Sequence, residues 1–151
     1  MSRKQEFYKI VQNHYQEHLH GTDQLIPRMA TLTAALKEKI PYYAGCGFYF
    51  AEQPEMEVGP YQGNIVCAKI GYNGICGAAT KTKKPVIVDD TKTYKGGRII
   101  CDEKTRSELA LSVYDPEGHL VAVFYAEAHT TKAFDKEDIL YLEKMFKQLF
   151  S

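Results

Sequence analysis

The amino-acid sequence predicts an α+β fold, in which an antiparallel sheet is covered by helices from the two ends of the chain. Apolar residues recur at helical spacing near both ends. Between them, short segments with β-type composition alternate with Gly and Pro turn signals. Hairpin connections between neighbouring segments favour antiparallel strands. The 151 residues suit a single domain, residues 1–151, built around one hydrophobic core.

Two helices are expected first, over residues 4–20 and 23–39, because their apolar side chains lie three or four positions apart. Gly21 separates the two helices. Thr22 or Asp23 is expected to cap the second helix, since a short side-chain oxygen can accept the free N–H groups of a helix start.

The middle of the chain is expected to hold short strands and one short helix. The turn DPEGH after Tyr114 predicts that the last two strands form a hairpin. Pro54 and the pair Gly59-Pro60 are expected to lie in the connection between the first two strands. The expected strands are residues 44–51, 63–70, 85–88, 109–114 and 120–126, the short helix is 75–82, and a final amphipathic helix covers 135–150.

Composition excludes several classes of partner. Lys and Arg number 19, as do Asp and Glu, so there is no net field to attract nucleic acid or anionic lipid. No apolar run approaches the roughly 18 residues of a membrane span, and the start has no apolar signal core. A cytoplasmic protein without nucleic-acid or membrane partners is expected. Its four cysteines would then be thiols at rest.

Two motifs could indicate a metal or a phosphate group, and neither is specific. His14 to His18 reads H-x-x-E-H, which matches the inverted zinc-protease signature, but so short a match is common and lacks a third ligand. A solvated helix face is the preferred interpretation. The glycine-rich segment 71–77 lacks the G-x-G-x-x-G spacing and the P-loop lysine. No metal and no organic cofactor are therefore expected.

Two cysteines lie in contexts that favour reactivity. Cys76 falls at the start of the helix expected over 75–82, where free N–H groups and the helix dipole favour a thiolate. Cys101 ends a long polar loop, with Arg98 and Arg106 near it in sequence, so it is expected to be exposed and electropositive. The alternative for each is a buried structural cysteine, which behaves as a small hydrophobic residue.

Glu108 and Glu127 form the most informative acidic pair. Glu108 begins one strand of the expected hairpin and Glu127 ends the other, so antiparallel pairing would put both at the same end of the sheet. Two carboxylates that converge there could bind an ammonium group, and their crowding would help one of them retain a proton.

These residues lie in an order that resembles the GAF family, and within it the free methionine-R-sulfoxide reductases. The resemblance covers about residues 20–150. It is carried by GFYF (47–50), GPYQG (59–63), VCAKI (66–70), GICGAA (74–79), RIICD (98–102), RSEL (106–109) and FDKED (134–138).

The resemblance implies a thiol mechanism. Cys101, in the I-x-C-D string, would attack the sulfoxide, and the resulting sulfenic acid would condense with Cys67 as the resolving thiol or with Cys76 as the alternative. The implied substrate is free methionine sulfoxide and the implied reductant a thioredoxin-like dithiol. The family resemblance also implies a homodimer.

The implied pocket contains acidic and aromatic groups. Glu108 would contact the substrate and donate the proton that the sulfoxide oxygen needs in order to leave. Glu127 and the hydroxyl of Tyr125 would hold the substrate ammonium, and Tyr49, in the GFYF string, belongs to the same substrate-binding set. The competing hypothesis is a non-catalytic GAF module that binds a small molecule or senses oxidation through Cys67 and Cys101.

Four positions depart from the family pattern. Gly45 stands where a pocket-closing tryptophan is usual, Tyr125 replaces an aspartate, Arg98 a histidine and Ser112 a proline. The ring of Tyr125 is expected to fill the space beside Gly45. The thiols are thus kept while the pocket is altered.

Overall fold

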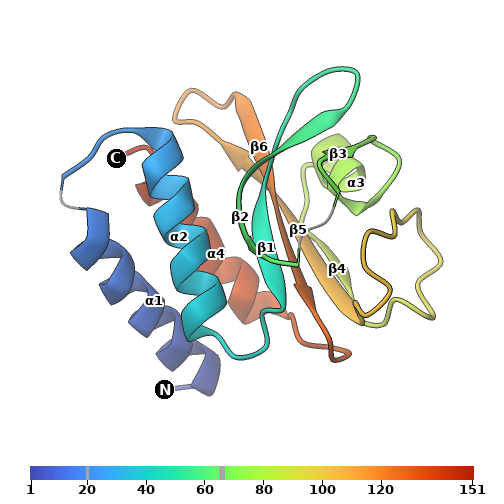
Figure 1. Cartoon of the computed structure of the whole chain (residues 1–151), viewed down its shortest axis with the longest axis horizontal. Coiled ribbons are helices and arrows are strands. Elements are labelled where there is room, and N and C mark those ends of the chain that lie inside the picture. Colours follow the sequence, from blue (N-terminus) through green and yellow to red (C-terminus); the bar gives the residue numbers. More distant parts are fainter. Residues whose placement is uncertain (20, 65–66) are drawn as a thin grey trace.

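The computed structural model describes residues 1–19, 21–64 and 67–151. It confirms the α+β fold, with six antiparallel strands in the order β3-β2-β1-β6-β5-β4 (Figure 1). In chain order the elements are α1 (Arg3–Leu19), α2 (Leu25–Lys39), β1 (Gly45–Phe50), β2 (Met56–Gly63), β3 (Lys69–Ile70), α3 (Ile75–Thr82), β4 (Val86–Val88), β5 (Ser107–Tyr114), β6 (Leu120–Ala128) and α4 (Lys136–Gln148).

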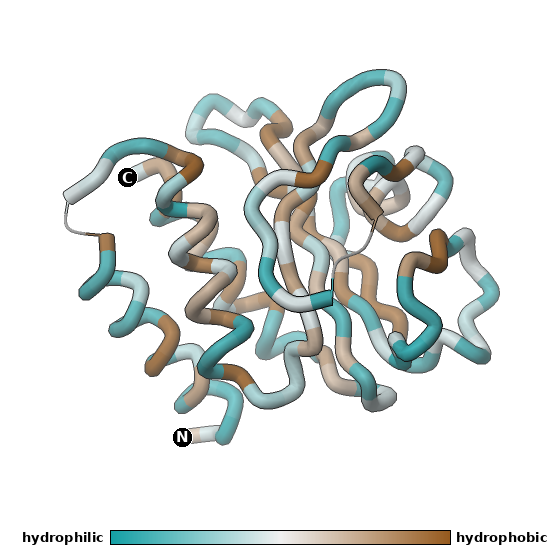
Figure 2. The backbone as a smooth tube through the Cα atoms, viewed as in Figure 1, coloured by the Kyte–Doolittle hydropathy of each residue, from teal (hydrophilic) through white to brown (hydrophobic). Residues whose placement is uncertain are grey.

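The sheet separates two groups of buried side chains. Helices α2 and α4 cover one face, with α1 packed on them from outside, and α3 lies against the other face (Figure 1). Along β6, Phe124 and Ala126 pack on the side of α2 and α4, whereas Val123 packs on the α3 side. Hydrophobic residues concentrate along the central strands, and the peripheral loops are mostly hydrophilic (Figure 2). The expected single core is therefore divided into two by the sheet.

The predicted helices form close to their expected bounds, but the expected cap of α2 is wrong. The N-cap of α2 is Gln24, and its side chain makes no capping hydrogen bond. The Thr22 hydroxyl instead accepts the Gln24 backbone N–H at 3.3 Å, two residues before the N-cap, so it does not cap the helix. His20, the last residue of the helix expected over residues 4–20, lies outside the described residues. None of the helices in the described ranges is long and apolar enough to cross a bilayer.

The prediction of a connection around Gly59-Pro60 is also wrong, because this pair lies inside β2. Gly47 of β1 pairs with Tyr61 and Tyr49 pairs with Val58, so residues 59 and 60 together face one residue of β1. This is a β-bulge, a place where a proline without an N–H can be accommodated in a strand. Of the strand expected over 63–70, only Lys69–Ile70 is observed as β3, and residues 65–66 lie outside the described part.

Asp138 joins the first and last helices through a buried polar network. Its side chain is fully buried and accepts hydrogen bonds from the hydroxyls of Tyr8, at 2.7 Å, and Tyr42. It also pairs with the Lys4 ammonium and accepts the Asp135 backbone N–H at 2.7 Å, which completes a capping box at the start of α4. The predicted start of this helix is confirmed.

Candidate functional site

Glu108 and Glu127 converge at one end of the sheet, as their strand positions predict. They are directly opposite each other in the β5–β6 pairing, and each is only 2% exposed. The Tyr125 hydroxyl lies between them, 2.8 Å from Glu108 Oε1 and 3.1 Å from Glu127 Oε2. Because a phenol carries a single proton, it can donate to only one of these carboxyl groups at a time.

Arg98 binds Glu108 from the loop between β4 and β5, residues 89–106, called here the 89–106 loop. Its Nε donates to Oε2 at 2.8 Å and its Nη2 to Oε1 at 2.9 Å. These hydrogen bonds, and the charge of the same carboxylate, raise the pKa of the Arg98 guanidinium. Both oxygens of Glu108 are therefore occupied by donors. Sequence reasoning noted Arg98 as a departure but did not predict this contact.

Glu127 is the carboxyl group of the site that is best suited to hold a proton. Burial raises the pKa of Glu127, and the negative charges of Asp102 and Glu108 add to the effect, while hydrogen bonds from Thr105 and Tyr125 partly oppose it. The Thr105 hydroxyl donates to Oε2 at 2.8 Å. The other oxygen, Oε1, is buried and has no hydrogen-bond partner among the described residues.

A disulfide joins Cys67, which precedes β3, to Cys101 in the 89–106 loop. The two Cα atoms are 5.6 Å apart, and both residues are half-buried. The Tyr49 hydroxyl donates to the Cys67 carbonyl oxygen at 2.9 Å, so β1 helps to position one of the two sulfurs. The ring of Tyr49 also meets that of Tyr125 edge to face.

The two remaining cysteines are buried thiols. The prediction of a favoured thiolate at Cys76 is wrong, because burial and then the negative charge of Glu108 raise the pKa of that thiol. Desolvation thus outweighs the dipole of the short helix α3. Cys46 lies on the opposite face of the sheet, where its sulfur donates to the Thr33 carbonyl at 3.5 Å.

A small cavity brings the predicted site residues together. Its volume is about 30 Å³, enough for ordered water but much less than a free amino acid occupies. All the candidate catalytic and binding residues line it except Cys67, which lies beside it through its bond to Cys101. The lining residues are Tyr49, Ile70, Gly74, Ile75, Cys76, Ile99, Cys101, Glu108, Tyr125 and Glu127.

Tyr125 does not take the place expected for it beside Gly45. It lies opposite Gly47 in the β1–β6 pairing, while Gly45 lies opposite Glu127. A Cβ atom on Gly45 would be 3.3 Å from Glu127 Oε1 and 3.1 Å from the Asn64 backbone nitrogen. The side chain next to Gly45 is therefore a carboxyl group, and the Tyr125 phenol serves the two glutamates.

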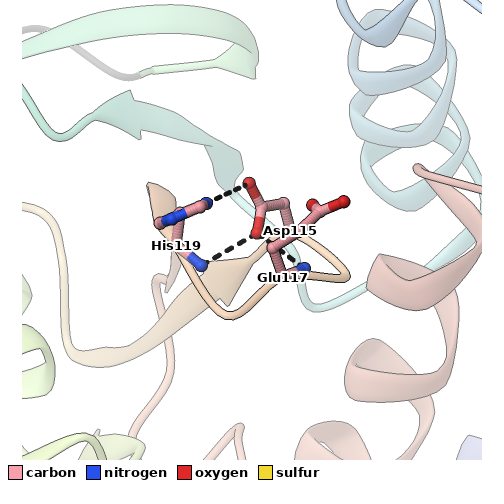
Figure 3. A group of neighbouring side chains, drawn as sticks. All are labelled: Asp115, Glu117 and His119. Atoms are coloured by element: carbon pink, nitrogen blue, oxygen red, sulfur yellow. Dashed lines mark hydrogen bonds and ion pairs between the residues drawn. The ribbon is translucent and has the colours of Figure 1, made fainter.

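Two groups resemble metal ligands without forming a convincing site. Asp115, Glu117 and His119 meet in the β5–β6 turn (Figure 3). There the Asp115 carboxylate accepts the backbone N–H groups of Glu117 at 3.0 Å and His119 at 2.8 Å, which is ordinary turn chemistry. His14 and His18 stack on α1 with ring centroids 4.1 Å apart.

Comparisons with known proteins point to one family. The model of the GAF domain matches residues 29–149. GAF domain-containing protein A of Dictyostelium discoideum is 32% identical over 148 residues, covering 97% of this chain and 92% of that protein. The free methionine-R-sulfoxide reductase of Saccharomyces cerevisiae is 34% identical over 105 residues, covering 67% of this chain and 58% of that protein. A substrate complex of the Neisseria meningitidis enzyme of that name superposes with a TM-score of 0.86 at 25% identity, covering 99% and 92% of the two chains.

Proposed function

The chain belongs to the GAF domain family, and from that premise we propose that it is an oxidoreductase that reduces free methionine-R-sulfoxide with cysteine thiols. The observation that carries the proposal is the Cys67–Cys101 disulfide beside a cavity lined by two buried carboxyl groups. Relatives of this chain in sequence and in structure are free methionine-R-sulfoxide reductases.

In the proposed reaction, the Cys101 thiolate attacks the sulfoxide sulfur while a proton is delivered to the sulfoxide oxygen. The oxygen passes to Cys101 as a sulfenic acid, and the sulfoxide leaves reduced as methionine. The Cys67 thiol then attacks the Cys101 sulfur, releases water and forms the disulfide. An external dithiol of the thioredoxin type returns two electrons and two protons, which regenerates both thiols.

The contacts favour Glu127 over Glu108 as the proton donor. Glu108 accepts two hydrogen bonds from the Arg98 guanidinium and faces the Tyr125 hydroxyl, an arrangement that stabilises a carboxylate. Glu127 is buried, its pKa is raised, and its Oε1 atom is unpartnered. We therefore exchange the roles that sequence reasoning suggested, so that Glu127 supplies the proton and Glu108 with Tyr125 receives the substrate ammonium.

The competing hypothesis, a sensing or binding module, would need only a disulfide that opens and closes. Two buried carboxyl groups and a phenol beside the disulfide favour an enzyme, because sulfoxide reduction needs both a thiol and an acid. The cycle also needs a compartment that keeps dithiols reduced, so we propose a cytoplasmic location. A homodimer is proposed on the family resemblance alone.

The test is incubation of the full chain with separated R and S epimers of free methionine sulfoxide, thioredoxin, thioredoxin reductase and NADPH. We expect NADPH consumption with the R epimer and none above background with the S epimer. Cys101→Ser should abolish turnover, because a hydroxyl is a far weaker nucleophile than a thiolate at neutral pH.

Cys67→Ser and Cys76→Ser form a matched pair that tests which thiol resolves. We expect Cys67→Ser to complete one turnover and accumulate a sulfenic acid that dimedone traps, and Cys76→Ser to keep turning over. Steady turnover by Cys67→Ser would assign the resolving role elsewhere. A folded wild-type protein that reduces neither epimer would support the sensing or binding hypothesis.

A further inference from the structure

The proposed reaction leaves one strong interaction of the site without a role, the ion pair between Arg98 and Glu108. The geometry points to Arg98 as a specificity-determining residue: we propose that the ammonium of a free amino-acid substrate replaces it on Glu108, and that its guanidinium then binds the substrate α-carboxylate. The inference rests on the proposed function, since it names how the same site selects free amino acids.

The size of the cavity supports this exchange. A cavity of about 30 Å³ is too small for the ten non-hydrogen atoms of methionine sulfoxide, so a side chain that lines it or adjoins it has to move on binding. Glu108 and Tyr125 are fixed on paired strands in the middle of the sheet. Arg98 alone among the partners of Glu108 comes from a loop, and its side chain is 13% exposed. It is therefore the group that can leave at least cost to the fold.

The charges also fit a zwitterion. Arg98 and Glu108 form one pair at 2.8 and 2.9 Å. A free α-amino acid carries an ammonium and a carboxylate on the same carbon, so it can enter between the two side chains and turn one ion pair into two. Nη1 of Arg98 has no hydrogen-bond partner among the described residues, so the guanidinium can offer a planar fork to a carboxylate.

This arrangement would reject sulfoxides that lack either charge. A substrate without the carboxylate would release Arg98 from Glu108 and leave the guanidinium without a partner. A substrate without the ammonium would have nothing to replace Arg98 on Glu108. Esters, amides and N-acylated forms of methionine sulfoxide, including peptides, should therefore be poor substrates.

The experiment compares kcat/KM for methionine-R-sulfoxide and its methyl ester in the wild type and in Arg98→Gln. In the wild type we expect the free acid to be preferred by about 10- to 100-fold, the effect of one charge-assisted contact. In Arg98→Gln this preference should collapse through loss of activity on the acid, while activity on the ester stays the same or rises, because no guanidinium is left without a partner. Arg98→Lys, which keeps the charge but loses the fork, should be intermediate.

Arg106→Gln is the matched control, because Arg106 is the last residue of the same loop but pairs with Asp90 at 3.4 Å. Its preference for the acid should equal that of the wild type. Equal losses on acid and ester in Arg98→Gln would overturn the inference and show that Arg98 acts only through Glu108. If Arg98→Gln does not fold, equal kcat/KM values for acid and ester in the wild type overturn the inference, and a strong preference for the acid supports it.

Calorimetry with L-methionine and its methyl ester on the reduced wild-type protein separates this inference from the proposed reaction. Selective binding of the free acid without turnover of any sulfoxide would support the role of Arg98 and refute the reductase. Turnover together with equal binding of acid and ester would refute the role of Arg98 and leave the reductase in place.

Discussion

Replacing Glu127 with Gln should make the stability of the protein less dependent on pH. The amide keeps the shape of the side chain and can still accept the Thr105 hydrogen bond, but it cannot ionise. In the wild type, burial raises the pKa of Glu127 above its ordinary value of 4.5. The folded protein therefore holds this proton more tightly than the unfolded chain does.

This difference in pKa fixes the direction in which the free energy of unfolding changes with pH. Below the ordinary pKa the Glu127 carboxyl is neutral in both the folded and the unfolded state, and its burial then does not lower the free energy of unfolding. As the pH rises through the raised pKa of the folded state, stability is lost, because the buried group must ionise or the chain must unfold. The loss amounts to about 1.4 kcal/mol for each unit by which the pKa is raised. The free energy of unfolding of Glu127→Gln should therefore rise relative to the wild type over this pH interval and level off above it.

Urea unfolding followed by circular dichroism, at several values from about pH 4 to about pH 8, measures this difference. The disulfide form of both proteins should be used, since it is the state described here. Glu103→Gln, at an exposed position of the 89–106 loop, is the control and should differ from the wild type by a constant amount. A difference between Glu127→Gln and the wild type that stays constant across this range would refute the assignment of Glu127 as the proton-holding carboxyl.

Three further substitutions test other contacts. Asp138→Ala should lower the free energy of unfolding by about 2–4 kcal/mol, because it removes the buried acceptor that the Lys4 ammonium shares with the hydroxyls of Tyr8 and Tyr42; a loss below about 1 kcal/mol in urea unfolding would contradict this. Tyr49→Phe should cost only about 1 kcal/mol but slow the closure of the disulfide after one turnover, since the hydroxyl no longer holds the Cys67 carbonyl. Rapid-quench thiol labelling measures that rate, and an unchanged rate would remove Tyr49 from the positioning of Cys67. Gly47→Ala should destabilise the sheet by about 1–3 kcal/mol, because the new Cβ would collide with the Cβ of Tyr61 and lie 2.9 Å from its Cα on the paired strand; a melting temperature equal to that of the wild type would argue against this close approach.

Local patterns predicted the helices and the hairpin because each depends on neighbours in sequence. The meeting of Glu108 and Glu127 was also predictable, since antiparallel pairing with a short turn fixes which residues face each other. The bulged strand β2 was not, because Gly59-Pro60 gives the same signal in a loop and in a bulge. Only pairing with β1 distinguishes the two.

The chemistry of the site depended on contacts that no local pattern contains. The sequence and its family resemblance identified the three thiols near the cavity and left open whether Cys67 or Cys76 would pair with Cys101, since pairing is set by the path of the 89–106 loop. The same loop brings Arg98 to Glu108, ten residues away in sequence. Cys76 was misjudged because the depth of burial, which raises the pKa of its thiol, depends on the packing of α3 against the sheet.

The alternation of side chains along β5 and β6 has a consequence for folding. Glu108 and Glu127 are directly opposite each other, and their strand neighbours Leu109, Ala126 and Ala128 belong to the apolar layer under the helices. If either strand moved along its partner by one residue, its glutamate would enter that apolar layer, away from Arg98 and Thr105. Burying an unpaired carboxyl there would cost several kcal/mol. The two glutamates therefore also raise the free energy of sheets with a shifted register while the chain folds. A variant with both replaced by Leu should lose this energy difference between the native and the shifted register.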